Sequence, residues 1–262
     1  MNGAKLHYLS WNFNASDKPV LLFVHGFRAH AHWWQHLAPF FQQHYRVVAM
    51  SLSGMGDSDF RDAYTASTFS DDIIGLLDNL QVQNVRTVAH SFGCSRVVKA
   101  AAERPDLFEQ LVMVDSDYRF DNEPPLVRKT PHQSPKIYPS RAAIEARFRL
   151  IPEQPIIFPD VLAHILKHSI CELEAGARWK FDPRIASFSA ASLTMDDYSP
   201  RLHLPVDFVY GTNSGVVEEA RISKQFALLP QGRHLHAIPG GYHHLMLDQP
   251  TALLSVLQVL LN

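Results

Sequence analysis

The sequence predicts an α/β fold with a mostly parallel central sheet, helices on both faces and a helical cap insertion. Short apolar runs alternate with stretches of helical spacing, which is the order that βαβ units require. Several of the apolar runs lack polar alternation, and this is typical of strands buried on both faces of a parallel sheet. We expect strands at residues 6–11, 20–24, 46–50, 85–88, 111–115, 205–211 and 234–238.

The helices of the core are expected between and after these strands. Helical spacing covers residues 34–41, 68–80 and 94–102, and an apolar helix over residues 252–261 closes the chain. Each of these stretches follows a predicted strand, so the chain passes repeatedly from sheet to helix and back. This alternation is the main evidence for a parallel sheet.

The alternation is interrupted once, in the middle of the chain. The interrupting segment has five prolines in its first third, followed by two helix-like pieces at residues 141–149 and 159–171. We therefore divide the chain into a core of residues 1–117 and 192–262 and a cap insertion of residues 118–191. The cap is expected to lie over the carboxyl edge of the sheet.

The composition narrows the classes of partner and compartment. A net charge of −2 over 262 residues provides no basic field for nucleic acid or anionic membranes. The two cysteines, Cys94 and Cys171, form no disulfide framework, which favours a reducing compartment. No apolar run approaches the roughly 20 residues of a membrane span, and the first residues lack a signal-peptide pattern. We expect a cytoplasmic protein with a small-molecule substrate, no nucleic acid and no membrane partner; its oligomeric state stays open.

The 15 histidines are numerous but scattered. They form no H-E-x-x-H motif, and the cysteines form no C-x-x-C pair, which are spacings typical of zinc sites. From the sequence we therefore expect neither a metal nor a cofactor.

The strongest functional signal is the pentapeptide Ala89-His90-Ser91-Phe92-Gly93. It joins a predicted buried strand to a predicted helix, and a sharp turn at this point lifts the serine hydroxyl out of the sheet. Such a turn needs small flanking residues, which Gly93 and Ala89 provide, although glycine is more usual at the first position. A serine hydroxyl is a poor nucleophile at its ordinary pKa, so Ser91 requires an adjacent base.

Several motifs occur together in a recognisable order. They are V-H-G-F at residues 24–27, G-M-G-D-S at 54–58, A-H-S-F-G at 89–93, G-G-Y-H at 240–243 and D-Q-P at 248–250. This set resembles the α/β-hydrolase superfamily, specifically a serine-hydrolase-like member with a cap domain, and the resemblance is weakest in the insertion. It implies a catalytic triad of serine, histidine and an acid, together with an oxyanion hole.

The resemblance also places the base of the triad in the glycine-rich loop after the last strand. Two histidines, His243 and His244, lie there. The family spacing puts the base seven positions before the proline of the loop, and Pro250 therefore favours His243. In this interpretation His244 packs against the substrate pocket or lines it.

The acid of the triad is marked less directly. Most members carry it three residues past the glycine that ends the strand at residues 206–210, but Gly211 is followed here by threonine, asparagine and serine. Some members, including haloalkane dehalogenases and cofactor-independent quinolone dioxygenases, carry it after the preceding strand. Asp115 occupies that position and is our preferred acid, with Asp117 as the alternative.

The resemblance further implies that the backbone amides of Phe27 and Phe92 stabilise the oxyanion. His25 is expected to brace the oxyanion loop through a hydrogen bond. The side chains expected near the substrate are His25, His30, Trp33, Trp34, His90 and His244.

These features predict a hydrolase of a small or medium apolar carboxylic ester, or a related acyl substrate, that works through an acyl-enzyme. One alternative is a cofactor-independent 2,4-dioxygenase of 3-hydroxy-4-quinolones that uses the His/Asp pair as a base. A carbon–carbon bond hydrolase is another. A non-catalytic receptor that holds a small hormone-like ligand over an intact triad is the alternative from a different functional class.

Overall fold

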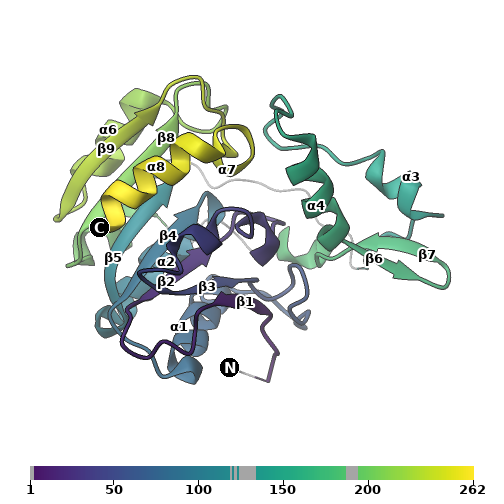
Figure 1. Cartoon of the computed structure of the whole chain (residues 1–262), viewed down its shortest axis with the longest axis horizontal. Helices are drawn as coiled ribbons and strands as arrows, with labels where there is room; N and C mark the ends of the chain where they lie inside the picture. Colours follow the sequence, from purple (N-terminus) through teal and green to yellow (C-terminus); the bar gives the residue numbers. More distant parts are fainter. Residues whose placement is uncertain (1–2, 119, 121–122, 124–133, 187–193) are drawn as a thin grey trace.

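The computed structural model describes residues 3–118, 120, 123, 134–186 and 194–262. Within these residues, the largest sheet has seven strands in the order β1-β3-β2-β4-β5-β8-β9 (Figure 1). The first strand pairs antiparallel with its neighbour and the other pairings are parallel, which confirms the predicted class. The strands are β1 (Tyr8–Trp11), β2 (Val20–Val24), β3 (Arg46–Met50), β4 (Val85–His90), β5 (Phe108–Val114), β8 (Val206–Gly211) and β9 (Gly232–Ile238).

The sheet separates two hydrophobic clusters. Successive residues of a strand point to opposite faces, so Leu21 and Phe23 enter one cluster while Leu22 and Val24 enter the other. This burial on both sides explains why the apolar runs show no polar alternation. On the Leu22 face lie α1 (Thr68–Leu80), α2 (Phe92–Glu103) and α6 (Glu219–Ala227); on the Leu21 face lie η1 (Ala31–Trp33), η2 (Ala38–Phe41), α7 (Leu245–Asp248) and α8 (Pro250–Leu261).

One core helix differs from the prediction. The α-helix expected over residues 34–41 is wrong, because within that range the chain forms only the short 3₁₀ helix η2, which follows η1 after four residues. Pro39 has no N–H to donate to the carbonyl of Gln35, and its ring clashes with a continuous α-helix. Three further short helices in the described residues are η3 (Pro105–Leu107), α5 (Met195–Tyr198) and η6 (Ser199–Arg201).

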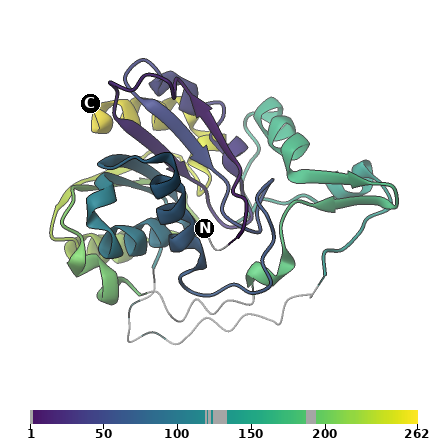
Figure 2. The same cartoon turned by 90° about the horizontal axis from the view of Figure 1, so that it is seen from below.

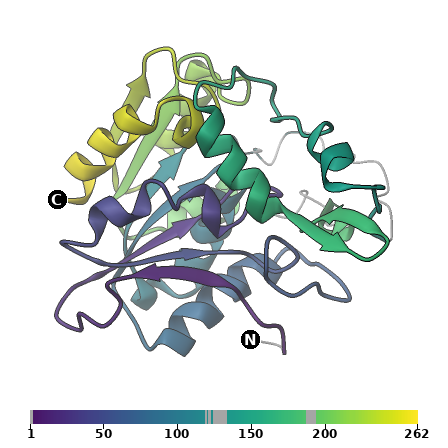
Figure 3. The same cartoon turned by 45° about the vertical axis from the view of Figure 1, so that its right-hand side comes forward.

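Residues 134–186, between β5 and β8, form a separate structural layer. It contains α3 (Arg141–Glu145), α4 (Pro159–Ser169), the antiparallel hairpin of β6 (Ile170–Leu173) and β7 (Gly176–Trp179), and η4 (Pro183–Ala186). Figures 1 and 2 show α3 and the hairpin beside the body that surrounds the main sheet, and Figure 3 shows α4 between that body and the hairpin. The helix expected over residues 159–171 ends at Ser169, and the hairpin was not predicted.

This inserted layer has a small core of its own. Ile144, Ile170 and Ala177 are buried together there, apart from the two clusters of the sheet. Asp182 ties the end of the layer to the body: its amide donates to the carbonyl of Gly54 over 2.8 Å, and its carboxylate accepts from the hydroxyl of Tyr64. Among the described residues, no helix has the length and hydropathy that crossing a membrane requires.

Candidate active site

Ser91 occupies a strained turn between β4 and α2. Its backbone has φ 50° and ψ −119°, a region that residues other than glycine adopt at a cost of about 1–3 kcal/mol. The turn is held by the amide of Ser91, which donates to the carbonyl of Val114 over 2.9 Å. It also requires Gly93, because a Cβ atom there would lie 2.5 Å from the carbonyl oxygen of His25. The local geometry is therefore that of a strand–turn–helix elbow.

Asp115 and His243 meet at the carboxyl edge of the sheet. Oδ1 of Asp115 lies 2.7 Å from Nδ1 of His243. The carboxyl group is fully buried, and it also accepts from the amide of Gly211 over 2.9 Å and from the hydroxyl of Ser214 over 2.7 Å. These donors hold the carboxylate in one orientation. A carboxylate only accepts hydrogen bonds, so His243 carries its proton on Nδ1 and keeps the lone pair of Nε2.

Ser91 and His243 line the same cavity, which has a volume of about 530 Å³. The position of His243 is further defined by His90, whose Nε2 donates to the carbonyl of His243 over 2.9 Å. Gly26 completes this packing, since a Cβ atom there would lie 2.7 Å from Nδ1 of His90. The cavity is therefore lined by Ser91 and by a histidine whose Nδ1 contacts a buried carboxylate.

The alternative base and acid have other partners. Nδ1 of His244 donates to the side-chain oxygen of Gln154 over 2.7 Å, and that oxygen also accepts from the backbone amide of His244. Asp117 accepts from Arg221 and, over 2.7 Å, from Gln225. Burial raises the pKa of Asp117, although its bond to Arg221 opposes the shift. In the described residues, the carboxylate that reaches His243 is that of Asp115.

Four of the six predicted pocket side chains line the cavity, namely His30, Trp33, His90 and His244. His25 and Trp34, which were also expected near the substrate, are not among the residues that line the cavity. Trp34 is fully buried against Phe23, with ring centroids 5.1 Å apart, because it follows Trp33 on a tight turn and points toward the sheet. His25 is turned away from the cavity as well: Nδ1 donates to the carbonyl of Gly26 over 2.7 Å and Nε2 accepts from the amide of Leu52 over 3.0 Å.

Four buried imidazoles near Ser91 have lowered pKa values and are uncharged near neutral pH. Burial, and then the nearby His243, lower the pKa of His244 to about 3, and burial lowers that of His25 to about 4. The pKa values of His30 and His90 are also held well below their ordinary value by burial. These rings therefore add no charge to the cavity, whose charged lining residues are Arg28, Arg147, Arg149 and Lys180.

The predicted oxyanion residues lie on either side of the elbow. Phe27 lines the cavity, and Phe92 is the first residue of α2, where helix amides have no acceptor within the helix. Their rings pack together with centroids 5.4 Å apart. This arrangement places both main-chain segments next to Ser91.

The inserted layer supplies much of the remaining cavity wall. The sequence predicted the insertion but none of its wall residues. These residues are Arg147, Phe148, Arg149, Leu150, Ile151, Ser169, Trp179, Lys180 and Phe181. Of the described residues that line the cavity, none is an aspartate or a glutamate, whereas Arg28 adds a further cation.

Known proteins share the fold and part of the sequence. The strigolactone esterase RMS3 of Pisum sativum is 32% identical over 113 residues, which cover 41% of this chain and 42% of that protein. The karrikin insensitive 2 receptor IA of Petunia hybrida is 32% identical over 113 residues, or 41% of each chain. The matches thus span about two fifths of the length of these curated relatives.

Two solved structures cover nearly the whole chain. The thioesterase domain from the curacin biosynthetic pathway has a TM-score of 0.81 at 24% identity, covering 98% of this chain and 96% of its own. The Mycobacterium tuberculosis esterase Rv0045c has a TM-score of 0.74 at 23% identity, covering 98% and 87%. A model of the alpha/beta hydrolase family matches residues 21–256. With the parallel sheet and the strand–turn–helix elbow, this match shows that the chain belongs to the alpha/beta hydrolase family.

Proposed function

We propose that this hydrolase cleaves a carboxylic ester, or a related acyl substrate, through an acyl-enzyme on Ser91. The observation that supports the proposal most directly is the 2.7 Å contact between Asp115 and His243, at a cavity that Ser91 also lines. A histidine with its Nδ1 proton held by a carboxylate presents a basic Nε2, which is the group that a serine nucleophile requires.

The reaction proceeds in two halves. Ser91 Oγ attacks the carbonyl carbon while its proton passes to Nε2 of His243, and the carbonyl electron pair moves onto oxygen. The pair returns, the bond to the leaving alcohol breaks, and His243 gives its proton to that alcohol. Water then attacks the acyl-enzyme with His243 again acting as the base, and the acid and free Ser91 are released. Asp115 stays ionised and stabilises the imidazolium in both halves.

The tetrahedral oxyanion is assigned to the amides of Phe27 and Phe92. Backbone donors aimed at the developing charge are worth about 3–4 kcal/mol each in related chemistry. Since both are main-chain groups, a substitution that shifts the backbone is needed to remove them. Gly26 is such a position, because its added Cβ atom would meet His90.

The residues that line the cavity indicate which esters it can bind. Aromatic side chains of Phe27, Trp33 and Phe148 provide an apolar surface, which supports a small or medium apolar acyl group. The exposed side chains of Arg147 and Arg149 also line the cavity, and the lining residues described include no carboxylate. We infer that the substrate is apolar next to Ser91 and carries an anionic group at its far end.

Two esters of equal chain length test this substrate class. We expect kcat/KM for mono-p-nitrophenyl adipate to exceed that for p-nitrophenyl hexanoate by about 10-fold, since one charge-assisted contact is worth about 1.5 kcal/mol. Arg147→Ala with Arg149→Ala removes the preference, whereas Arg201→Ala, on the sheet side of the molecule, leaves it. Equal rates for the two esters in the unchanged protein contradict the anionic substrate but leave ester hydrolysis intact.

A fluorophosphonate probe tests the nucleophile. We expect stoichiometric labelling of the unchanged protein on Ser91, and none in Ser91→Ala. Absence of labelling together with tight retention of a small ligand favours a receptor. Absence of labelling with oxygen uptake on a 3-hydroxy-4-quinolone favours the dioxygenase, and either result overturns the proposal.

A further inference from the structure

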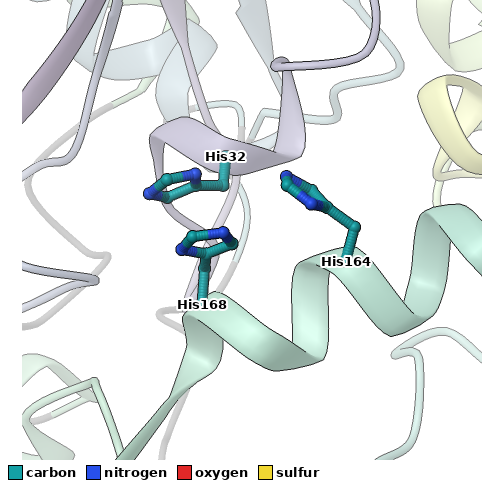
Figure 4. A group of neighbouring side chains, drawn as sticks. All are labelled: His32, His164 and His168. Atoms are coloured by element: carbon teal, nitrogen blue, oxygen red, sulfur yellow. The ribbon is translucent and has the colours of Figure 1, made fainter.

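Three histidines outside the proposed catalytic group gather where α4 of the inserted layer faces the body. His164 and His168 are four residues apart, so they project from the same face of α4, while His32 lies on η1 across from them (Figure 4). One nitrogen from each imidazole can be chosen so that all three lie within 4.8 Å of one another. These side chains come from two segments more than a hundred residues apart in the sequence.

The chemistry of the three rings suits a divalent transition metal. Imidazole nitrogen is the commonest protein ligand of Zn²⁺ and neighbouring metals, provided that the ring is neutral. Burial, followed by the neighbouring His32 and His164, lowers the pKa of His168 to about 4, and burial lowers the pKa of His32 and His164 as well. The rings therefore do not need to release protons when a metal binds near neutral pH.

Gln35 orients two of the rings. Its Oε1 lies 2.6 Å from Nδ1 of His32 and 2.9 Å from Nε2 of His164. An amide oxygen only accepts, so both rings donate to it. This leaves lone pairs on Nε2 of His32 and on Nδ1 of His164. Because both N–H groups point at one oxygen, the two lone pairs face away from it, and the rings must turn before these nitrogens can bind one ion.

The rings have to close around an ion. Zn–N bonds of about 2.0–2.1 Å place two tetrahedral ligands about 3.4 Å apart, somewhat less than the present spread. The rings of His32 and His168 are stacked, with centroids 3.6 Å apart and planes 10° apart. Since a metal binds in the plane of a ring, one of these rings must rotate out of the stack. His164 and His168 are only partly buried, which leaves room for that rotation and for a water molecule as fourth ligand.

We propose that His32, His164 and His168 form a reversible site for a divalent transition metal such as Zn²⁺. A bound ion connects α4, which carries His164 and His168, to η1 of the body, which carries His32. The same seam already contains a contact of 2.8 Å between His30 and Ser169, both of which line the cavity. A metal at this seam therefore restrains the inserted layer one turn of α4 away from the cavity wall.

The local charges permit a bound cation. Lys180 and Lys167 both lower the pKa of His168, and Nζ of Lys180 lies 2.5 Å from Oδ1 of Asp57. The Asp57 carboxylate offsets that charge, and it also lies close to His7 and His32. Asp57 therefore offsets the charge of Lys180, whereas Lys167, the residue before His168, adds a positive charge that opposes binding of the ion.

Isothermal titration of the full-length protein without a histidine tag tests the site with ZnCl₂ and CoCl₂. We expect one ion per chain, and a visible absorption band of four-coordinate Co²⁺. His164→Ala and His168→Ala are each expected to weaken binding by more than 100-fold, and Gln35→Ala by about 10- to 100-fold. His44→Ala, on the exposed surface away from the seam, is the matched control and leaves affinity unchanged.

The melting temperature provides a second measurement, which also applies to variants that are less stable. Zn²⁺ is expected to raise the melting temperature of the unchanged protein in proportion to its occupancy, and not to raise that of His168→Gln, whose fold is checked by circular dichroism. The proposal is overturned if the unchanged protein binds no metal. It is also overturned if His164→Ala and His168→Ala bind as tightly as the unchanged protein, for example because His234 and His236 on β9 hold the ion instead.

Discussion

The body around the main sheet and the inserted layer contribute to the cavity in different ways. The body holds Ser91 and Asp115 directly after the buried strands β4 and β5, and His243 in the loop after β9, where Asp115 contacts its Nδ1. The inserted layer has a core of only three buried residues and supplies cavity wall. We propose from this comparison that the body positions the reacting groups and that the insertion selects the substrate.

The largest expected effect concerns the acid in the body. Asp115→Asn should lower kcat/KM for a p-nitrophenyl ester by about 10⁴-fold, because loss of the orienting carboxylate disrupts the tautomer and charge of His243. Asp117→Asn, two residues on, should lower it less than about 10-fold, since Asp117 contacts Arg221 and Gln225. Circular dichroism shows whether the variants remain folded. Comparable losses in both variants would refute the division of roles between these two acids.

A stability experiment sharpens the contrast between the two regions. Ile73→Ala, in α1, should lower the free energy of unfolding by about 2–5 kcal/mol, as cavities in a large core do. Ile144→Ala, in the small core of the insertion, should lower it by less than about 1 kcal/mol, while increasing hydrogen exchange over residues 141–179. Urea unfolding and exchange mass spectrometry measure these effects. Equal losses of global stability would show that the insertion unfolds together with the body.

The smallest effect is a pH dependence that comes from the buried imidazole of His244. Its pKa is lowered to about 3 in the folded protein, against about 6.5 when unfolded, so the unfolded chain binds the extra proton as the pH falls below 6.5. Stability is therefore lost with falling pH, by about 2 kcal/mol between pH 6.5 and 5. His244→Gln should flatten that part of the stability curve in urea titrations. An unchanged slope would mean that His244 is already protonated in the folded state.

The sequence was most informative about the strands that are buried on both faces of the sheet. Continuous apolar runs predicted the parallel strands, because each run is covered on both faces. The helix expected over residues 34–41 was wrong because the helical spacing of the whole segment was given more weight than Pro39. In the protein, Pro39 prevents a continuous α-helix. The hairpin of β6 and β7 was missed because each strand has only four residues and little alternation.

Side-chain direction and long-range contacts were harder to predict. Trp33 and Trp34 are adjacent and alike, yet one lines the cavity and the other lies in the core, which depends on how η1 packs against the sheet. The sequence limited the triad acid to Asp115 or Asp117, and only coordinates relate either to His243. For the histidine cluster, the four-residue spacing of His164 and His168 was a visible signal, but nothing in the sequence brings His32 beside them.

The most direct test of the account is a rapid-mixing experiment with a p-nitrophenyl ester, followed by acid quench and peptide mapping. Release of p-nitrophenol should show a burst of one equivalent per chain, and the acyl group should be found on the peptide that contains Ser91. His243→Ala should abolish the burst. Turnover without a covalent acyl group, or an acyl group on another residue, would contradict the claim that Ser91 is the nucleophile.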